Sequence, residues 1–173
     1  MARYAALLRA VNVGGVKVAM ADLRALAEEL GYDEVSTHLN SGNLLLASGQ
    51  DAATVEARLA EALAERYGRE VPVMARTRAE LEDALARLPF AGGSYEESRA
   101  QVGFLSAAPV AGAADGLGPF DGEEWALDGR EVFLYYPNGM GRSKLTTAVL
   151  ERALAVRVTV RGARTVAGLV ARL

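Results

Sequence analysis

The spacing of hydrophobic residues along the first 76 residues switches repeatedly between two periods. Continuous or alternating apolar residues, typical of β-strands, are separated by stretches in which apolar residues recur every three or four positions, typical of α-helices. The predicted elements are, in chain order, a strand over residues 4–11, a helix over 20–30, strands over 34–40 and 44–47, a helix over 51–67 and a strand over 71–75. This β-α-β-β-α-β order predicts a ferredoxin-like unit, in which the helices cover one face of an antiparallel sheet.

The second half of the chain repeats this order less regularly. A capping box formed by Thr77 and Glu80 begins a further helix, which ends before Pro89. The elements predicted beyond it are a strand over 100–107, a weak, glycine-broken helix over 109–118, a hairpin about Asp128–Gly129, a helix over 145–154, a short strand over 157–160 and a last helix capped by Thr165. We therefore predict an α+β fold of two ferredoxin-like subdomains with antiparallel sheets. They occupy residues 1–76 and, imperfectly and with a C-terminal helix, 99–173, joined by a connecting helix and linker at 77–98.

Composition excludes several classes of site. Hydrophobic residues make up 51% of the 173 residues and charged residues 24%, which is typical of a globular chain. No apolar run approaches the ~20 residues that span a bilayer, and Arg9 interrupts the N-terminal apolar stretch, so we expect a cytoplasmic protein without a membrane partner. Cysteine is absent and His38 is the single histidine, which excludes disulfides, thiol catalysis and metal sites of cysteine or clustered histidine. We expect no cofactor and no bound metal.

Charge is unevenly distributed along the chain. The net charge is −3, but residues 142–173 contain seven basic side chains and one acidic side chain and so carry +6. Such a segment could contact the phosphate groups of a nucleotide or a nucleic acid. The alternative is a solvated helix face packed on an acidic body, and we carry both interpretations forward.

The segment Asn12–Gly15, with Lys17 close behind it, combines features of an anion-binding loop. It lies between the first predicted strand and the first predicted helix. Gly14 and Gly15 let main-chain N–H groups approach a ligand without a Cβ in the way, and a helix start adds unpaired donors. Neither the Walker sequence G-x-x-x-x-G-K-[ST] nor G-x-G-x-x-G is present. The loop is therefore either a phosphate cradle of another kind or a tight turn.

A second loop of this kind, PNGMGRSK, follows an apolar strand at residues 137–144. Its candidate ligand-binding residues are Asn138, Gly139, Gly141, Arg142, Ser143 and Lys144. Arg142 and Lys144 bring two cations, and the Ser143 hydroxyl either caps the following helix or donates to an anion. Two cations at a helix start oppose the helix dipole, at a cost of about 0.5 kcal/mol that a bound anion would remove. We therefore predict an anion site here, against the alternative of a helix N-terminus with two solvated bases.

Topology predicts which loops share a surface. In a β-α-β-β-α-β unit, the end of the first strand and the first hairpin lie at the same edge of the sheet. Asn12, Lys17, Ser41 and Asn43 should therefore surround one surface. The 137–144 loop instead follows the third strand of its unit, which runs the opposite way.

Three classes of function are consistent with these residues. The first is a binding module for a phosphate-bearing ligand, a nucleotide or a nucleic-acid backbone, held by the two glycine-rich loops. The second is an enzyme acting on a phosphorylated small molecule, for which the candidates are Ser41 or Ser143 beside a cation, with His38 on the polar face of its strand. The third is an interaction protein that forms a homodimer through an open sheet face. We favour binding, assign no catalytic residue and leave a homo-oligomer open.

The same stretches carry a family resemblance. The segments LLRAVNVGGVKVAMADLRALAEELGYDEVSTHLNSGNLLL and FLYYPNGMGRSKLTTAVLERAL closely resemble the bacterial family called domain of unknown function 1697. The resemblance runs nearly end to end and implies a compact cytosolic α+β protein of ferredoxin-like character, with no established activity to carry over. The family signature falls on Arg9, Asn12, Gly14, Gly15, Met20, Ser41, Gly42, Asn43, Pro137, Asn138, Gly139, Gly141, Arg142, Ser143 and Lys144. The family usually has glycine where Ala10 stands and an Asn-Trp pair where Gly162 and Ala163 stand.

Overall fold

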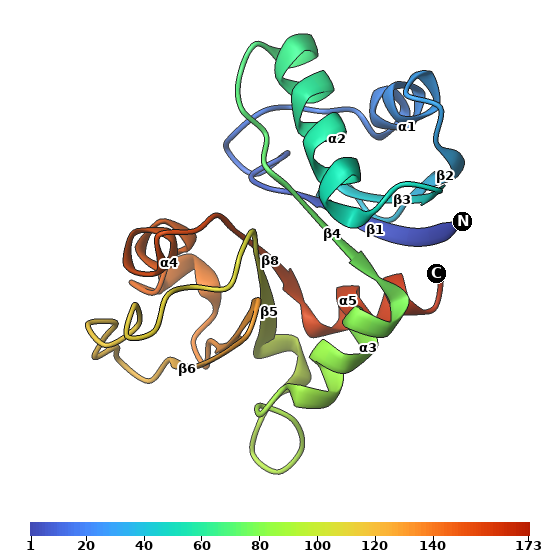
Figure 1. Ribbon diagram of the computed structural model, residues 1–173. Helices are drawn as coiled ribbons and strands as arrows, with labels where there is room; N and C mark the ends of the chain where they lie inside the picture. The colour runs from blue at the N-terminus through green and yellow to red at the C-terminus, as the bar shows by residue number, and fades with distance from the viewer. The chain divides into compact units, whose positions relative to one another are not determined.

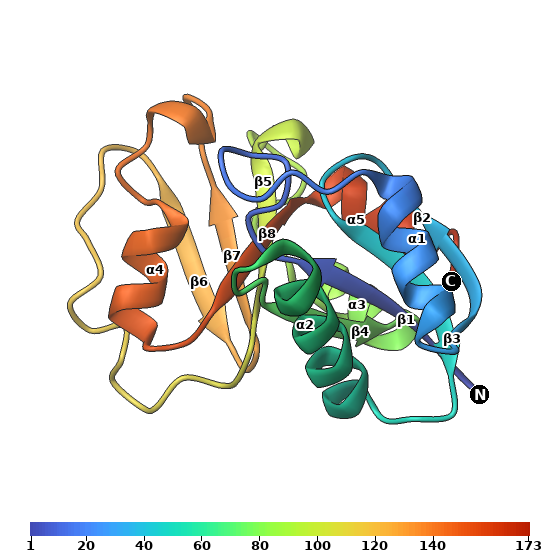
Figure 2. The same cartoon turned by 90° about the horizontal axis from the view of Figure 1, so that it is seen from above.

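The computed structural model describes residues 1–173 and contains two four-stranded antiparallel sheets (Figures 1 and 2). The strands are β1 (Ala2–Leu8), β2 (Asp33–Thr37), β3 (Asn43–Ser48), β4 (Val73–Thr77), β5 (Ala100–Leu105), β6 (Glu124–Asp128), β7 (Glu131–Tyr135) and β8 (Val158–Gly162). The helices are α1 (Met20–Glu29), α2 (Ala52–Tyr67), α3 (Arg78–Arg87), α4 (Thr147–Leu154) and α5 (Ala163–Val170), with short 3-10 helices η1 (Glu97–Arg99) and η2 (Met140–Arg142). None of the helices combines the length with the apolar character that crossing a bilayer requires.

The strands β1–β4 form a sheet in the order β2-β3-β1-β4, with every neighbouring pair antiparallel. Helices α1 and α2 lie over the same face of this sheet in both views (Figures 1 and 2). Leu8, Leu44 and Leu46 of the strands pack with Leu23 of α1 and Leu59 of α2 into one core. This is the ferredoxin-like arrangement that the apolar pattern predicts.

Helix boundaries in this half follow from the chemistry of the end residues. Asp51 caps α2, because its side chain accepts from the Thr54 N–H at 2.8 Å, and Gly68 ends the helix with a left-handed φ of 68°. The capping box before α3 is present: Thr77 Oγ1 accepts from the Glu80 N–H at 3.3 Å, and the Glu80 carboxylate accepts from the Thr77 N–H at 2.7 Å. These predicted caps are confirmed.

The second sheet has the order β6-β7-β5-β8, and its β5 and β8 pair with the same alignment of residues as β1 and β4 of the first sheet. Ala5 of β1 lies opposite Arg76 of β4, and Val102 of β5 lies opposite Arg161 of β8. Arg76 and Arg161 therefore occupy equivalent positions, and both are buried. The prediction of two ferredoxin-like halves with antiparallel sheets is confirmed.

Two predictions about the second half are wrong. The helix predicted over 109–118 is absent, and residues 106–123 form turns and irregular chain instead. Gly112 and Gly118 adopt φ of 81° and 114°, which a right-handed helix does not accommodate. The last helix begins at Ala163 rather than after a cap at Thr165, because β8 runs into α5 without an intervening loop.

The central strands are buried on both faces. All six residues of β3 and all five of β7 are buried, so side chains that point to either side of each sheet are covered. Along β1, Ala5 and Leu7 are as inaccessible as Ala6 and Leu8, at 0% exposure. Exposed side chains are found instead on the edge strands β2 and β6.

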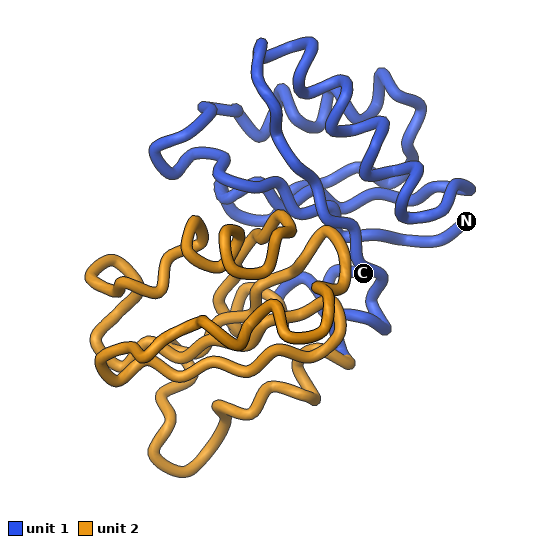
Figure 3. Tube along the Cα trace, turned by 60° about the vertical axis from the view of Figure 1, so that its left-hand side comes forward, with its two compact units in different colours: residues 1–82, 168–173 blue, residues 83–167 orange.

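The chain divides into two compact units (Figure 3). Unit 1 comprises residues 1–82 together with 168–173, and unit 2 comprises residues 83–167. The C-terminal residues are held in unit 1 by Arg3, whose Nη1 donates to the Leu173 carbonyl oxygen at 2.6 Å. One glycine-rich loop lies in each unit.

Candidate anion-binding site

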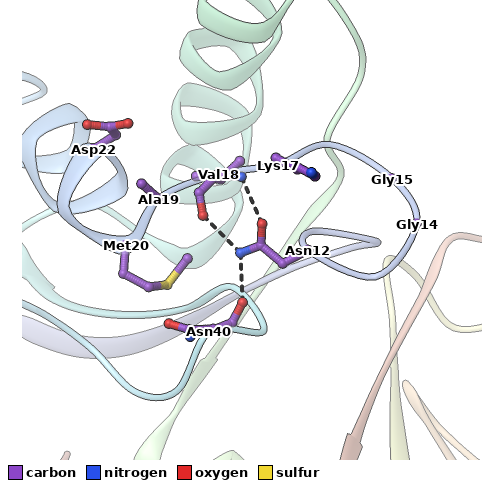
Figure 4. A pocket seen from close by; sticks show the side chains of 9 residues that line it. All are labelled: Asn12, Gly14, Gly15, Lys17, Val18, Ala19, Met20, Asp22 and Asn40. Atoms are coloured by element: carbon purple, nitrogen blue, oxygen red, sulfur yellow. Dashed lines mark hydrogen bonds between the residues drawn. The ribbon is translucent and has the colours of Figure 1, made fainter.

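Asn12 organises the loop between β1 and α1. Its Nδ2 donates to the carbonyl oxygens of Val18 and Asn40, both at 2.8 Å, and its Oδ1 accepts from the Val18 N–H at 2.9 Å (Figure 4). The loop is thereby closed on itself and tied to the turn between β2 and β3. Because both N–H donors of this amide are used by the protein, Asn12 shapes the loop.

The two loops at this edge of unit 1 are neighbours, as the topology predicts. The Leu8 N–H donates to the Gly42 carbonyl oxygen at 2.9 Å, and a Cβ on Gly42 would lie only 2.9 Å from the Leu8 Cβ. Asn43 is fully buried, and its Nδ2 donates to the His38 carbonyl oxygen at 2.8 Å and to Ser41 Oγ at 3.0 Å. Ser41 and Asn43 thus stabilise the turn and do not line the adjacent hollow.

Left-handed backbone conformations are concentrated in these two loops. Ala10, Asn12 and Leu39 have φ of 55°, 60° and 59°, although none of them is glycine. Each such residue costs about 1 kcal/mol, which the surrounding structure must offset. Gly15 is constrained differently, because a Cβ there would lie only 2.2 Å from the Ala10 carbonyl oxygen. Strain held in this way is a feature of ligand sites.

A hollow of about 1000 Å³ opens beside the first loop (Figure 4). It is lined by Asn12, Gly14, Gly15, Lys17, Val18, Ala19, Met20, Asp22 and Asn40. The N–H groups of Gly14 and Gly15 donate to no protein acceptor, and the exposed Lys17 amine forms no ion pair. Ala19 offers no capping side chain, so the first N–H groups of α1 are unpaired as well. Donors without protein partners are therefore gathered along one hollow.

Lys17 and Asp22 give this hollow two ends of opposite charge. Lys17 lies on the side of the Gly14–Gly15 turn, whereas Asp22 lies at the far side, on the first turn of α1 (Figure 4). Asp22 is also close enough to Tyr67 of α2 to affect its ionisation: burial raises the pKa of the Tyr67 phenol most, and the Asp22 charge raises it further. The hollow is therefore bipolar rather than uniformly positive.

The 137–144 loop borders a smaller hollow of about 350 Å³ in unit 2. It is lined by Asp121, Glu123, Asn138, Gly139, Arg142, Ser143 and Lys144. Gly141, the remaining predicted residue, does not line it. The loop pattern alone did not indicate Asp121 and Glu123, which the turns of 106–123 bring beside the two cations.

Ser143 and Glu123 are directly linked in this second hollow. Ser143 Oγ accepts from the Leu145 N–H at 2.9 Å, and its hydroxyl donates to the Glu123 carboxylate. That hydrogen bond is the main cause of the lowered pKa of Glu123, and the Lys144 charge lowers the pKa further. A carboxylate of the protein itself therefore interacts with groups that an anionic ligand would need.

The helix that follows this loop starts later than predicted. Thr146, not Ser143, caps α4, its Oγ1 accepting from the Val149 N–H at 3.2 Å. Arg142 and Lys144 therefore precede the first helical turn, so they do not oppose the α4 dipole from within it. The ends of the loop are held together because the buried Tyr136 hydroxyl donates to the Leu145 carbonyl oxygen at 2.9 Å.

His38, the single histidine, packs against α5. A Cβ on Gly168 would lie 2.8 Å from His38 Nε2. Burial lowers the pKa of His38, and the charge of Arg172 lowers it further. No group of three or more acidic or histidine side chains could hold a metal ion. The enzyme alternative therefore gains no support from a cluster of metal-binding side chains around His38.

The basic residues of 142–173 do not form one unpaired surface. Arg161 is buried in β8, and Arg164 pairs with Glu97 at 2.9 Å. Arg157 lies 3.9 Å from Glu151. A nucleic-acid track is built from exposed cations that exchange counterions for phosphates. Arg161 is buried, and the exposed Arg157 and Arg164 would have to exchange a carboxylate of the protein for a phosphate.

Comparisons with known proteins give a family and a fold, but no activity. The sequence profile of a family described as "Protein of unknown function (DUF1697)" matches residues 1–133, so the 137–144 loop lies beyond the match. The structure of conserved bacterial protein SP0830 from Streptococcus pneumoniae is similar, with a TM-score of 0.75 and 25% sequence identity over 100% of this chain and 98% of that one. No protein of curated function matches the chain.

Proposed function

We propose that this chain, which belongs to the DUF1697 family of proteins of unknown function, binds a phosphate-bearing small molecule in the hollow beside Gly14, Gly15 and Lys17. One observation carries the proposal: unpaired loop N–H groups, the uncapped start of α1 and an unpaired amine line the same hollow. Main-chain donors combined with a cation are the usual protein partners of phosphate oxygens.

The residues of the loop take different parts in this proposal. Gly14 and Gly15 supply N–H groups that reach the ligand without a Cβ, and Lys17 supplies the positive charge. Asn12 holds the loop in shape through its bonds to Val18 and Asn40. Preorganisation of the donors in this way reduces the entropy that binding must overcome.

The size of the hollow favours a ligand larger than a phosphate ion. A volume of about 1000 Å³ lies at the upper end of the ~300–1,000 Å³ range of small-molecule sites. A nucleotide is of suitable size. A nucleic-acid backbone is disfavoured, because the hollow contains a single cation and the 142–173 arginines described above are buried or paired.

The 137–144 loop is the weaker candidate for an anion site. Its two cations, Arg142 and Lys144, share their hollow with the carboxylates of Asp121 and Glu123, and the Lys144 charge already interacts with Glu123. Ser143 already donates to Glu123. We therefore expect phosphate compounds to bind less tightly at Asn138–Lys144 than beside Lys17.

Isothermal titration calorimetry tests the proposal by measuring the affinity of wild type, Lys17→Ala and Arg69→Ala for AMP. Arg69 is an exposed cation of unit 1 that lines neither hollow, so it is the matched control. We expect Lys17→Ala to weaken binding about tenfold and Arg69→Ala to leave it unchanged. Absence of AMP binding, or equal affinities in all three proteins, would overturn the proposal. Tight binding of a single-stranded oligonucleotide with steep salt dependence would point to nucleic acid instead.

A further inference from the structure

We infer that the ligand of this hollow is a sugar phosphate, bound with its phosphate at Gly14–Lys17 and its hydroxyl groups at Asp22. The inference rests on the proposed function and adds the chemical class of the ligand. It starts from a feature that phosphate binding alone leaves unexplained: a carboxylate lines the same hollow as the cation.

Asp22 is unfavourable to a ligand that is only an anion. A carboxylate accepts hydrogen bonds and donates none, and it repels a phosphate. Lys17 and Asp22 together leave the hollow without net charge. A carboxylate becomes favourable when the ligand offers donors to it, as the hydroxyls of a sugar do.

The two charges are placed for a ligand with two chemically different ends. Figure 4 shows Lys17 beside the Gly14–Gly15 turn and Asp22 at the opposite side of the hollow. Lys17 and Asp22 form no ion pair with each other, so both remain available to a ligand. A phosphate ester of a polyol satisfies both ends at once, which neither inorganic phosphate nor an uncharged sugar does.

The lining between the two ends suits a carbon skeleton. Ala19 lies between the two ends and Met20 lies on the side of Asn40, and both carry apolar side chains, whereas the Val18 side chain is buried in the core (Figure 4). Apolar walls with a few polar groups at fixed places are the usual composition of small-molecule sites. A sugar phosphate could be free, or it could be the ribose phosphate of a nucleotide, and both share the chemistry that this lining recognises.

Isothermal titration with inorganic phosphate, ribose 5-phosphate and AMP tests the inference on wild type, Asp22→Asn and Glu28→Gln. Glu28 is an exposed carboxylate of the same helix that does not line the hollow, so it controls for the lost charge. Asp22→Asn should bind inorganic phosphate about twofold more tightly, because repulsion is removed. It should bind ribose 5-phosphate and AMP about fivefold more weakly, because hydrogen bonds to a charged acceptor are lost. Glu28→Gln should leave all three affinities unchanged.

The outcomes separate the inference from the proposed function. If Asp22→Asn tightens all three compounds alike while Lys17→Ala weakens them, the inference is overturned and phosphate binding stands. If none of the three compounds binds, or if Lys17→Ala changes nothing, the proposed function is overturned with it. Opposite effects of Asp22→Asn on phosphate and on the two sugar phosphates support the inference. The ranking of AMP against ribose 5-phosphate then identifies a nucleotide or a free sugar phosphate as the source.

Discussion

The Asn12 Nδ2 donates to the Asn40 carbonyl oxygen at 2.8 Å and so joins the two loops at one edge of unit 1. The same side chain also bonds both polar groups of the Val18 main chain. Gly14 and Gly15 lie between Asn12 and Val18, so their N–H groups are carried on a segment with fixed ends. The loop conformation is therefore a property of the protein before any ligand arrives.

Replacing Asn12 with glycine should lower the free energy of unfolding by about 2 kcal/mol, because its side-chain hydrogen bonds contribute roughly 0.5–1.5 kcal/mol each. Glycine relieves the strain of the native φ of 60°, and the extra chain entropy that it loses on folding is of similar size, so the net loss reports on the hydrogen bonds. Urea denaturation measures it, with Asn138→Gly as the control at an exposed asparagine without a side-chain bond. An equal loss in both variants would contradict the role given to Asn12.

Replacing Ala10 with glycine should stabilise the protein by about 0.5 kcal/mol. Alanine at φ of 55° is strained by about 1–2 kcal/mol, and relief of that strain outweighs the roughly 0.5–1 kcal/mol of extra chain entropy that glycine loses on folding. Thermal melting of Ala57→Gly provides a control of opposite sign, since glycine at this exposed position inside α2 should destabilise by about 1 kcal/mol. A destabilised Ala10→Gly protein would show that the strain is not present in solution.

Gly42→Ala should destabilise unit 1 by about 2 kcal/mol, because its Cβ would meet the Leu8 Cβ and alanine disfavours positive φ. The distance between the two Cβ atoms would be 2.9 Å, and φ at Gly42 is 76°. Gly49→Ala is the matched control, since a Cβ there meets nothing within 4 Å. Its midpoint in urea should change little, and equal midpoints for the two variants would contradict the close approach of the two loops.

Tyr136 should make unit 2 sensitive to alkaline pH. Burial, together with a smaller effect of the Glu123 charge, raises the pKa of Tyr136 from 10.0 to about 12. A group whose pKa is higher in the folded than in the unfolded chain contributes stability below the unfolded value, and this stability is lost as pH rises from about 10 toward 12. Wild type should therefore lose about 2 kcal/mol more than Tyr136→Phe between about pH 9 and about pH 11.5. Equal losses, measured by urea denaturation, would contradict the shift.

Apolar spacing predicts the strands of both halves, because the residues that cover each sheet recur with the period of their element. Arg76 and Arg161 occupy equivalent positions in β4 and β8, so the pairing of single residues is the same in the two halves. The spacing fails over 106–123, where Leu117 and Phe120 pack against the unit 2 core without a helix. Gly112 and Gly118 adopt positive φ, which a right-handed helix does not accommodate. The spacing of apolar residues gives no indication of these backbone conformations.

The candidate site could be predicted only where its residues are adjacent in the sequence. Gly14, Gly15 and Lys17 share a short segment, so their combination is visible before folding. Asn40 and Asp22 reach the hollow through tertiary structure, and Asp22 reads in the sequence as an ordinary acidic residue of a helix start. Asn43 has a side chain that could bind a ligand, but its Nδ2 donates to groups of the turn itself, the His38 carbonyl oxygen and Ser41 Oγ.

The central claim is that the N–H groups of Gly14 and Gly15 meet phosphate oxygens next to the Lys17 amine. A ¹⁵N-edited NMR titration with AMP measures this directly, because each backbone amide reports its own environment. The account predicts saturable shifts of the Gly14 and Gly15 amide signals in wild type, with a weaker affinity in Lys17→Ala. Saturation of AMP binding while both glycine amide signals stay in place would contradict it.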